Sequence, residues 1–62
     1  ALLDSLPGVQ REVVIMKFYE DLPFKEIAEK TGVSINTSLG RMRYALINLR
    51  KLIRKHQMSL VG

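Results

Sequence analysis

The sequence predicts an all-α fold: a bundle of three to four helices with a helix-turn-helix at its C-terminal end, winged-helix-like but without a wing. Three observations predict it. Apolar residues recur every three or four positions over most of the 62 residues. Proline or glycine interrupts this pattern at Pro7, Pro23 and Gly32. Cysteine is absent, so helix packing must stabilise this small domain without disulfides or thiolate metal sites.

The first two helices meet at Pro7. The three leucines before it have the spacing of a last helical turn, so we expect residues 1–62 to be one domain of a longer protein, its first helix reduced to a stub. Pro7 favours the start of a new helix, because its fixed φ suits the first turn. The segment from Val9 to Tyr19 is apolar on nearly every side. This composition predicts the central, most deeply buried helix.

A short helix and a sharp turn follow Pro23. Residues 24–31 place apolar and charged side chains on opposite sides at helical spacing. Gly32 predicts the end of this helix, since glycine takes the left-handed conformation without steric cost. Ser34 predicts the start of the next one, as an N-cap whose hydroxyl accepts a backbone N–H. The result is helix, three-residue turn, helix.

The last helix is expected to be long, from about Ile35 to about His56, with an irregular tail over residues 59–62. At 1.5 Å per residue its length is roughly 30 Å, so its far end should project beyond a core this small. Its expected apolar face follows the helical spacing of Ile35, Leu39, Met42, Leu46, Leu49 and Ile53.

Charge is distributed unequally along the chain. Residues 1–29 contain all six acidic residues and three basic ones, a net charge of −3. Residues 30–62 contain seven basic residues and no acid, a net charge of +7. Such asymmetry favours a polyanionic partner, either nucleic acid or an anionic membrane surface. The alternative is a solvated helix face that keeps the domain soluble.

Enzymatic chemistry finds no support in the sequence. His56 is the only histidine, and a metal site needs several converging ligands. No base lies near the serines and threonines, and the four glycines are too scattered for a phosphate-binding loop. We therefore expect no catalytic residue, no metal, no cofactor and no small-molecule substrate. The longest apolar run, residues 13–16, is far below the ~20 residues that span a bilayer, so we expect no membrane-spanning segment. A membrane is also not among the partners that we expect.

The segment from residue 24 to residue 44 has the features of a DNA-reading helix-turn-helix, in which the second helix enters the major groove. A helical hairpin in another small bundle is the structural alternative. The candidate DNA-binding residues are Lys25, Asn36, Thr37, Gly40, Arg41, Arg43 and Tyr44. We expect Arg43 and Tyr44 to reach base edges, and Asn36, Thr37 and Lys25 to contact phosphate, with Arg41 in either role.

Gly40 has two possible explanations. A missing side chain in the middle of the outer face leaves room for a groove to approach closely, although glycine weakens a helix by roughly 1 kcal/mol. A tolerated surface glycine is the alternative. Helical spacing also places Asn48 and Lys51 on this outer face, together with Thr37 and Tyr44.

These residues resemble the fourth conserved region of extracytoplasmic-function (ECF) sigma factors. The resemblance covers nearly the whole chain and rests on Leu6-Pro7, Gln10-Arg11-Glu12-Val13, Phe18-Tyr19-Glu20, Lys25-Glu26-Ile27-Ala28-Glu29, Gly32-Val33-Ser34, Thr37, Arg41-Met42, Ala45-Leu46 and Leu49-Arg50. It implies a cytoplasmic transcription factor that recognises promoter DNA near the minus thirty-five position. It also implies docking on the β flap of the RNA polymerase core and, in many members, sequestration by an anti-sigma factor.

The sequence departs from the family pattern at two places. The family commonly has an apolar residue followed by a basic one where this chain has Ser38 and Leu39, so base contacts of that basic residue do not transfer to Leu39. Tyr44 stands where many members have arginine, which replaces a bidentate guanine contact by a ring and a hydroxyl. The preferred promoter hexamer is therefore expected to differ from the common one.

Two other interpretations remain open at this stage. The DNA-binding domain of LuxR-type response regulators shares the Arg-Glu-Val and Lys-Glu-Ile-Ala segments, but its last helix typically carries Val-Lys-x-His where this chain has residues 38–41. A cationic amphipathic helix that binds membranes or acidic proteins is the other. Such a helix would not need the turn formed by Gly32 and Ser34.

Overall fold

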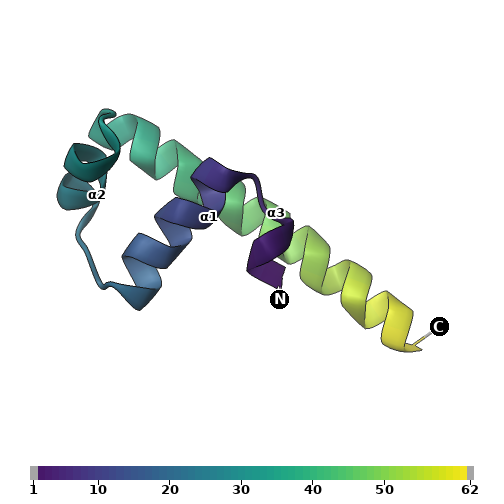
Figure 1. Ribbon diagram of the computed structural model, residues 1–62. Helices are drawn as coiled ribbons and strands as arrows, with labels where there is room; N and C mark the ends of the chain where they lie inside the picture. Colours follow the sequence, from purple (N-terminus) through teal and green to yellow (C-terminus); the bar gives the residue numbers. More distant parts are fainter. Residues whose placement is uncertain (1, 62) are drawn as a thin grey trace.

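The computed structural model describes the backbone of residues 2–61 and the side chains of residues 3–56. Its elements are the 3-10 helix η1 (Leu2–Ser5), α1 (Gly8–Val14), the π-helical segment η2 (Ile15–Tyr19), α2 (Phe24–Thr31) and α3 (Ile35–Val61). The described residues contain helices and connecting turns only, which confirms the predicted all-α class. Figure 1 shows α1 and α2 beside the first half of α3, η1 across its middle, and its second half projecting away.

Pro7 starts α1 as the sequence predicts. Its carbonyl accepts the N–H groups of Gln10 and Arg11, both at 3.0 Å. The helix then passes directly into η2, where the Glu20 N–H donates to the Ile15 carbonyl at 3.1 Å, five residues back. This π turn widens the end of the helix.

The prediction that this helix is the most deeply buried is only partly correct. Val13 and Val14 are buried, but Phe18 is 64% exposed and Tyr19 is 74% exposed. A domain of this size has too few elements to cover a helix on every side, so only the side of α1 that meets α3 is enclosed. Apolar composition in η2 therefore does not produce burial.

Gly32 ends α2 in the predicted way. It adopts a left-handed conformation at φ 70°, and two hydrogen bonds close the helix end: Val33 N–H to the Ala28 carbonyl at 3.0 Å and Gly32 N–H to the Glu29 carbonyl at 3.4 Å. This pair of bonds is the Schellman arrangement, which satisfies carbonyls that the end of a helix leaves without partners. Thr31 completes the cap, since its hydroxyl donates to the Ile27 carbonyl at 2.7 Å.

Ser34 caps α3, also as predicted. Its side-chain oxygen accepts the Thr37 N–H at 3.1 Å, and its hydroxyl donates to the Thr37 side-chain oxygen at 3.0 Å. The two caps on either side of a three-residue turn fix the chain direction between α2 and α3. The predicted helix-turn-helix is therefore present.

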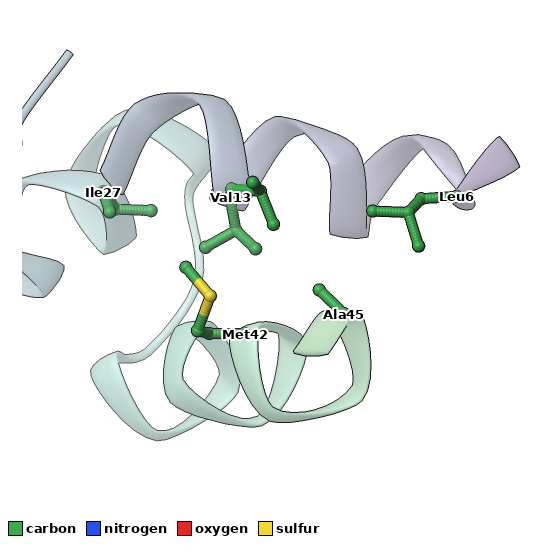
Figure 2. Packing of buried hydrophobic residues seen from close by; sticks show 6 residues of the cluster. Leu6, Val13, Ile27, Met42 and Ala45 are labelled. Atoms are coloured by element: carbon green, nitrogen blue, oxygen red, sulfur yellow. The ribbon is translucent and has the colours of Figure 1, made fainter. Parts of the chain in front are cut away.

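The core lies between α3 and the N-terminal elements. Figure 2 shows the side chains of Val13, Ile27, Met42 and Ala45 converging on one interior, with Leu6 at its end. Ile27 and Ala45 are fully buried, at 0% exposure. Small Ala45 lets α3 approach its neighbours closely, while Met42 fills the space beside it. A hydrogen bond of 2.7 Å from Asn48 Nδ2 to Gln10 Oε1 adds a polar tie between α1 and α3.

The buried face of α3 differs from the predicted one. The core side is formed by Ser38, Met42 and Ala45, with Leu49 and Leu52 half-buried beyond them. Four residues of the predicted stripe are instead 42–45% exposed: Ile35, Leu39, Leu46 and Ile53. At about 100° per residue the true buried face is rotated by roughly 60° from the predicted one. The small side chains of Ser38 and Ala45 let α3 pack closely against the N-terminal elements, which accounts for this rotation.

α3 is also longer than predicted. It continues to Val61, so an irregular tail is wrong for residues 59–61, and Gly62 lies outside the described residues. The molecule measures 43 × 19 × 15 Å, and its long dimension follows α3. The predicted projection of this helix beyond the core is confirmed.

Candidate nucleic-acid interface

The outward face of α3 lies opposite the buried face formed by Ser38, Met42 and Ala45. Helical spacing places four residues of its first half there: Asn36, Gly40, Arg43 and Ile47. Asn36 and Arg43 are exposed, and Ile47 is 39% exposed. We use "outward face" for these four residues. The rotation of the helix puts Arg43 closer to the centre of this face than the predicted register did.

The other candidates on α3 lie beside this face. Thr37 and Tyr44 are exposed on one flank, Tyr44 at 62%. Arg41 is half-buried next to the core side, so its guanidinium begins from a less outward position than that of Arg43. Asn48, which the sequence places on the outer face, is instead half-buried and bonded to Gln10. That prediction is wrong because it depended on the unrotated register.

The N-terminal turn of α3 is built around Thr37. Its N–H and its side-chain oxygen both bond to Ser34, so its side chain is held in one orientation. Other N–H groups of a helix's first turn have no partner within the helix and carry partial positive charge, which suits phosphate oxygens. Asn36 is exposed in this same turn. The turn therefore offers short polar groups and N–H donors to an anion.

Lys25 comes from another element. It is exposed in the first turn of α2, and the helix-turn-helix holds α2 against α3. A lysine on the bracing helix is suited to a phosphate beside the groove rather than to a base edge.

The electrostatic character of the surface follows the sequence. No acidic residue occurs after Glu29, so no carboxylate from α3 neutralises Arg43 or the cations that follow it. The acidic side chains belong to the N-terminal half, where Asp4 pairs with Arg11 at 3.8 Å. The chain thus separates a cationic long helix from N-terminal elements of net negative charge.

The burial of Ser38 and Leu39 is the reverse of what their polarity favours. Ser38 is 1% exposed and its hydroxyl has no hydrogen-bond partner among the described residues, whereas Leu39 is 45% exposed. The apolar position is therefore turned outward and the polar one inward. Since Leu39 has no polar group, it offers only apolar contact to a partner.

Two residues of the α3 surface were not singled out from the sequence. Ile47 lies on the outward face four residues after Arg43, and Arg54 follows at the next helical repeat. In the sequence, an isolated apolar side chain such as that of Ile47 gives no indication of a binding role. The corrected rotation of the helix is what places both on this side.

A second exposed surface lies at the end of η2. Phe18 and Tyr19 are exposed, while Lys17 lies with its Nζ 4.8 Å from the centre of the half-buried Phe24 ring. Burial decreases along this segment: Val14 is buried, Ile15 half-buried and Phe18 exposed. We call Phe18 and Tyr19 the aromatic edge.

The described residues form neither a metal-binding cluster nor a membrane-spanning helix. No three histidine, aspartate or glutamate side chains gather closely enough to hold a metal ion among them. None of the described helices combines the length and the apolar character needed to cross a bilayer.

Comparison with known proteins identifies the family. Residues 1–46 match the family described as sigma-70, region 4. The chain is 40% identical over 57 residues to the RNA polymerase sigma factor SigV of Bacillus subtilis, covering 92% of this chain and 34% of that protein. It is 35% identical over 51 residues to the ECF RNA polymerase sigma factor SigK of Mycolicibacterium vanbaalenii, covering 82% and 26% of the two chains.

A third relative, the ECF RNA polymerase sigma factor RpoE of Cereibacter sphaeroides, is 39% identical over 46 residues, covering 74% of this chain and 25% of that protein. The chain thus spans between a quarter and a third of these relatives. No solved structure gives a significant match. The match favours the sigma-factor interpretation over the LuxR-type alternative. This chain belongs to the sigma-70 region 4 family, in its ECF group.

Proposed function

We propose that this chain is the domain of a cytoplasmic sigma factor that recognises the minus thirty-five promoter element and helps to recruit RNA polymerase. One observation carries the proposal: a capped α2–turn–α3 unit directs an acid-free helix face, with Arg43 near its centre, away from the core. In this geometry α3 enters the major groove and α2 braces it from outside.

The residues of α3 divide into two roles. Arg43 reads a base, since arginine donates two parallel hydrogen bonds to the O6 and N7 atoms of guanine. Tyr44 makes a stacking or hydroxyl contact beside it, and Ile47 offers an apolar contact to a thymine methyl group. Asn36 and Thr37 hold phosphate at the helix N-terminus, while Gly40 permits close approach. Lys25 and Arg41 add phosphate contacts on the two sides.

The test is a binding series over single-base variants of the preferred hexamer. Arg43→Ala should cost about 1–3 kcal/mol on the preferred site and relax discrimination at one base pair. Arg11→Ala is the matched control, since it removes an arginine that lies on α1 beside Asp4. A uniform loss over every variant for Arg43→Ala would reassign this side chain to phosphate.

Phosphate contacts have a different signature. Thr37→Ala and Lys25→Ala should weaken binding to all duplexes alike, and only Lys25→Ala should make the salt dependence shallower, because threonine carries no charge. The unsubstituted chain should bind duplex DNA with an affinity that falls steeply between about 50 and 200 mM salt. No binding at low salt would refute the proposed function.

Polymerase contact is assigned to a separate surface. The aromatic edge, Phe18 and Tyr19, lies at the end of η2 and is exposed, and uncovered apolar surface marks partner sites in small domains. We place the β flap of the polymerase core there, and an anti-sigma factor would compete for the same edge. Phe18→Ala should weaken polymerase binding and leave duplex binding unchanged. Crosslinks from the β flap to residues 41–55 alone would contradict this assignment.

A further inference from the structure

The second half of α3 carries positive charge where the fold does not require a helix. Leu52 is the last residue of α3 that is half-buried among the described side chains, and residues 53–56 are all exposed. In Figure 1 this part of the helix runs beyond every other element. We call residues 50–61 the distal half. Its backbone is helical to Val61, although Leu52 is its last described side chain that packs against the core.

The cations of the distal half follow the outward face. Lys51 and Arg54 lie four and seven residues after Ile47, which places them on the same side of the helix as Arg43. Arg50 lies on the flank, and all three are exposed. From Arg43 to Arg54 the helix rises about 16 Å. One continuous surface therefore runs from the proposed base-reading residue to the distal cations.

The arrangement of charges is unfavourable for an isolated helix. Arg50 and Arg54 are four residues apart, a spacing at which like charges repel, and no acidic residue follows Glu29 to separate them. A solvated helix face is normally stabilised by pairs of opposite charge at this spacing. The repulsion is relieved when a polyanion lies along the helix.

We propose that the distal half is a second DNA contact, which binds the sugar-phosphate backbone beyond the edge of the promoter hexamer through Lys51 and Arg54, with Arg50 beside them. This inference rests on the proposed function. The family match ends at residue 46, so the distal half is outside the part of the chain that the match covers.

The geometry of the duplex explains why this contact is made to phosphate. The major groove is about 12 Å wide and winds around the duplex, whereas α3 is straight, so its far end leaves the groove and passes over a phosphate strand. DNA carries one charge per about 1.7 Å of its axis, so a helix crossing there meets several phosphates. Long, flexible cations can span the remaining gap. The side chains at positions 51 and 54 have this chemistry.

The experiment compares duplexes that carry the preferred hexamer and are extended by half a helical turn on one side or the other. For the unsubstituted chain, one of the two extensions should raise affinity by about three- to tenfold, as one or two added phosphate contacts would. The double variant Lys51→Gln/Arg54→Gln should lose this gain. Its salt dependence, as the slope of log K against log salt, should become shallower by about two.

Two variants serve as controls. Arg11→Gln/Lys17→Gln removes the same charge from the N-terminal elements and should keep both the length gain and the slope. Lys51→Arg/Arg54→Lys keeps the charges and should behave like the unsubstituted chain. Circular dichroism of each variant checks that α3 stays helical, which is expected because positions 51 and 54 are exposed.

The outcomes separate the two proposals. A chain that binds no duplex refutes the proposed function itself. A chain that binds the hexamer, with no length gain and an unchanged slope in the double variant, refutes only the distal contact. Binding to phosphatidylserine vesicles that the double variant loses, with its duplex slope unchanged, would assign the distal half to an anionic membrane surface and overturn the inference.

Discussion

The two halves of α3 differ in what holds them. The first half, residues 35–49, is capped by Ser34, packed by α1 and α2, and tied to α1 through Asn48. The distal half has cations on its exposed surface, and its described side chains after Leu52, those of residues 53–56, are all exposed. One continuous helix thus has a first half that is enclosed by other elements and a distal half whose residues 53–56 are exposed. Substitutions of buried residues in the first half should therefore lower stability, whereas substitutions of exposed residues in the distal half should leave stability nearly unchanged.

The largest effect is expected from shortening a core isoleucine. Ile27 is 0% exposed between α2 and the other helices, so Ile27→Ala should lower the free energy of unfolding by about 2–5 kcal/mol. The matched variant Ile53→Ala removes the same atoms from the distal half, where the side chain is 45% exposed, and should change stability by no more than about 0.5 kcal/mol. Urea denaturation measures both. If both variants lost the same free energy of unfolding, the side chain of Ile53 would be buried in solution, and the description of the distal half as exposed would be wrong.

The next prediction concerns the turn at Gly32, which positions the first half of α3. Gly32 has φ 70°, where a Cβ atom is unfavourable although nothing lies within 4 Å of its position. Gly32→Ala should cost about 1–2 kcal/mol through backbone strain alone. Gly8→Ala is a suitable control, because Gly8 also has open space around it and its φ is not in this region. If both variants lost the same stability, the left-handed conformation would not be the cause.

A gain in stability is expected at Ser38. Its hydroxyl is buried without a partner among the described residues, and a buried polar group in that state costs about 1–3 kcal/mol. Ser38→Ala should raise the free energy of unfolding by about 1 kcal/mol, since alanine is also the better helix former. Thermal unfolding should show the increase. A loss would mean that the hydroxyl bonds to the preceding turn of α3 in solution.

Sequence patterns predicted the local features of this chain better than the packing. Pro7, Gly32 and Ser34 act through their own backbone or side chain within a few residues, so their roles could be read without knowing the fold. The rotation of α3 could not be read from the sequence, because a row of larger apolar side chains indicated a different buried face from the one that contains Ser38 and Ala45. Which of the two faces is buried depends on how closely α1 and α2 approach α3. The exposure of Phe18 and the π turn over Ile15–Tyr19 were not predicted, because both depend on how the other elements pack around this segment.

The structure changes where some candidate DNA-binding residues lie on α3, and their role in binding stays a prediction. Arg43, Asn36 and Gly40 share the outward face, so their grouping depended only on helical spacing. Asn48 was misassigned because its bond to Gln10 joins residues 38 positions apart. Contacts of that kind depend on tertiary structure and leave no local trace in the sequence.

The smallest effect is expected at Gly40, a position that should influence both the stability of α3 and its contact with DNA. Nothing lies within 4 Å of a Cβ atom at this position, so the fold has room for a side chain. Gly40→Ala should stabilise the helix by about 0.5–1 kcal/mol, because glycine is the poorer helix former. If the outward face approaches the groove closely at this point, the same methyl group should weaken binding to the preferred duplex. If the variant is more stable and binds DNA equally well, Gly40 is an ordinary surface glycine. If it is more stable but binds DNA more weakly, the glycine lowers the stability of α3 and allows closer contact with DNA.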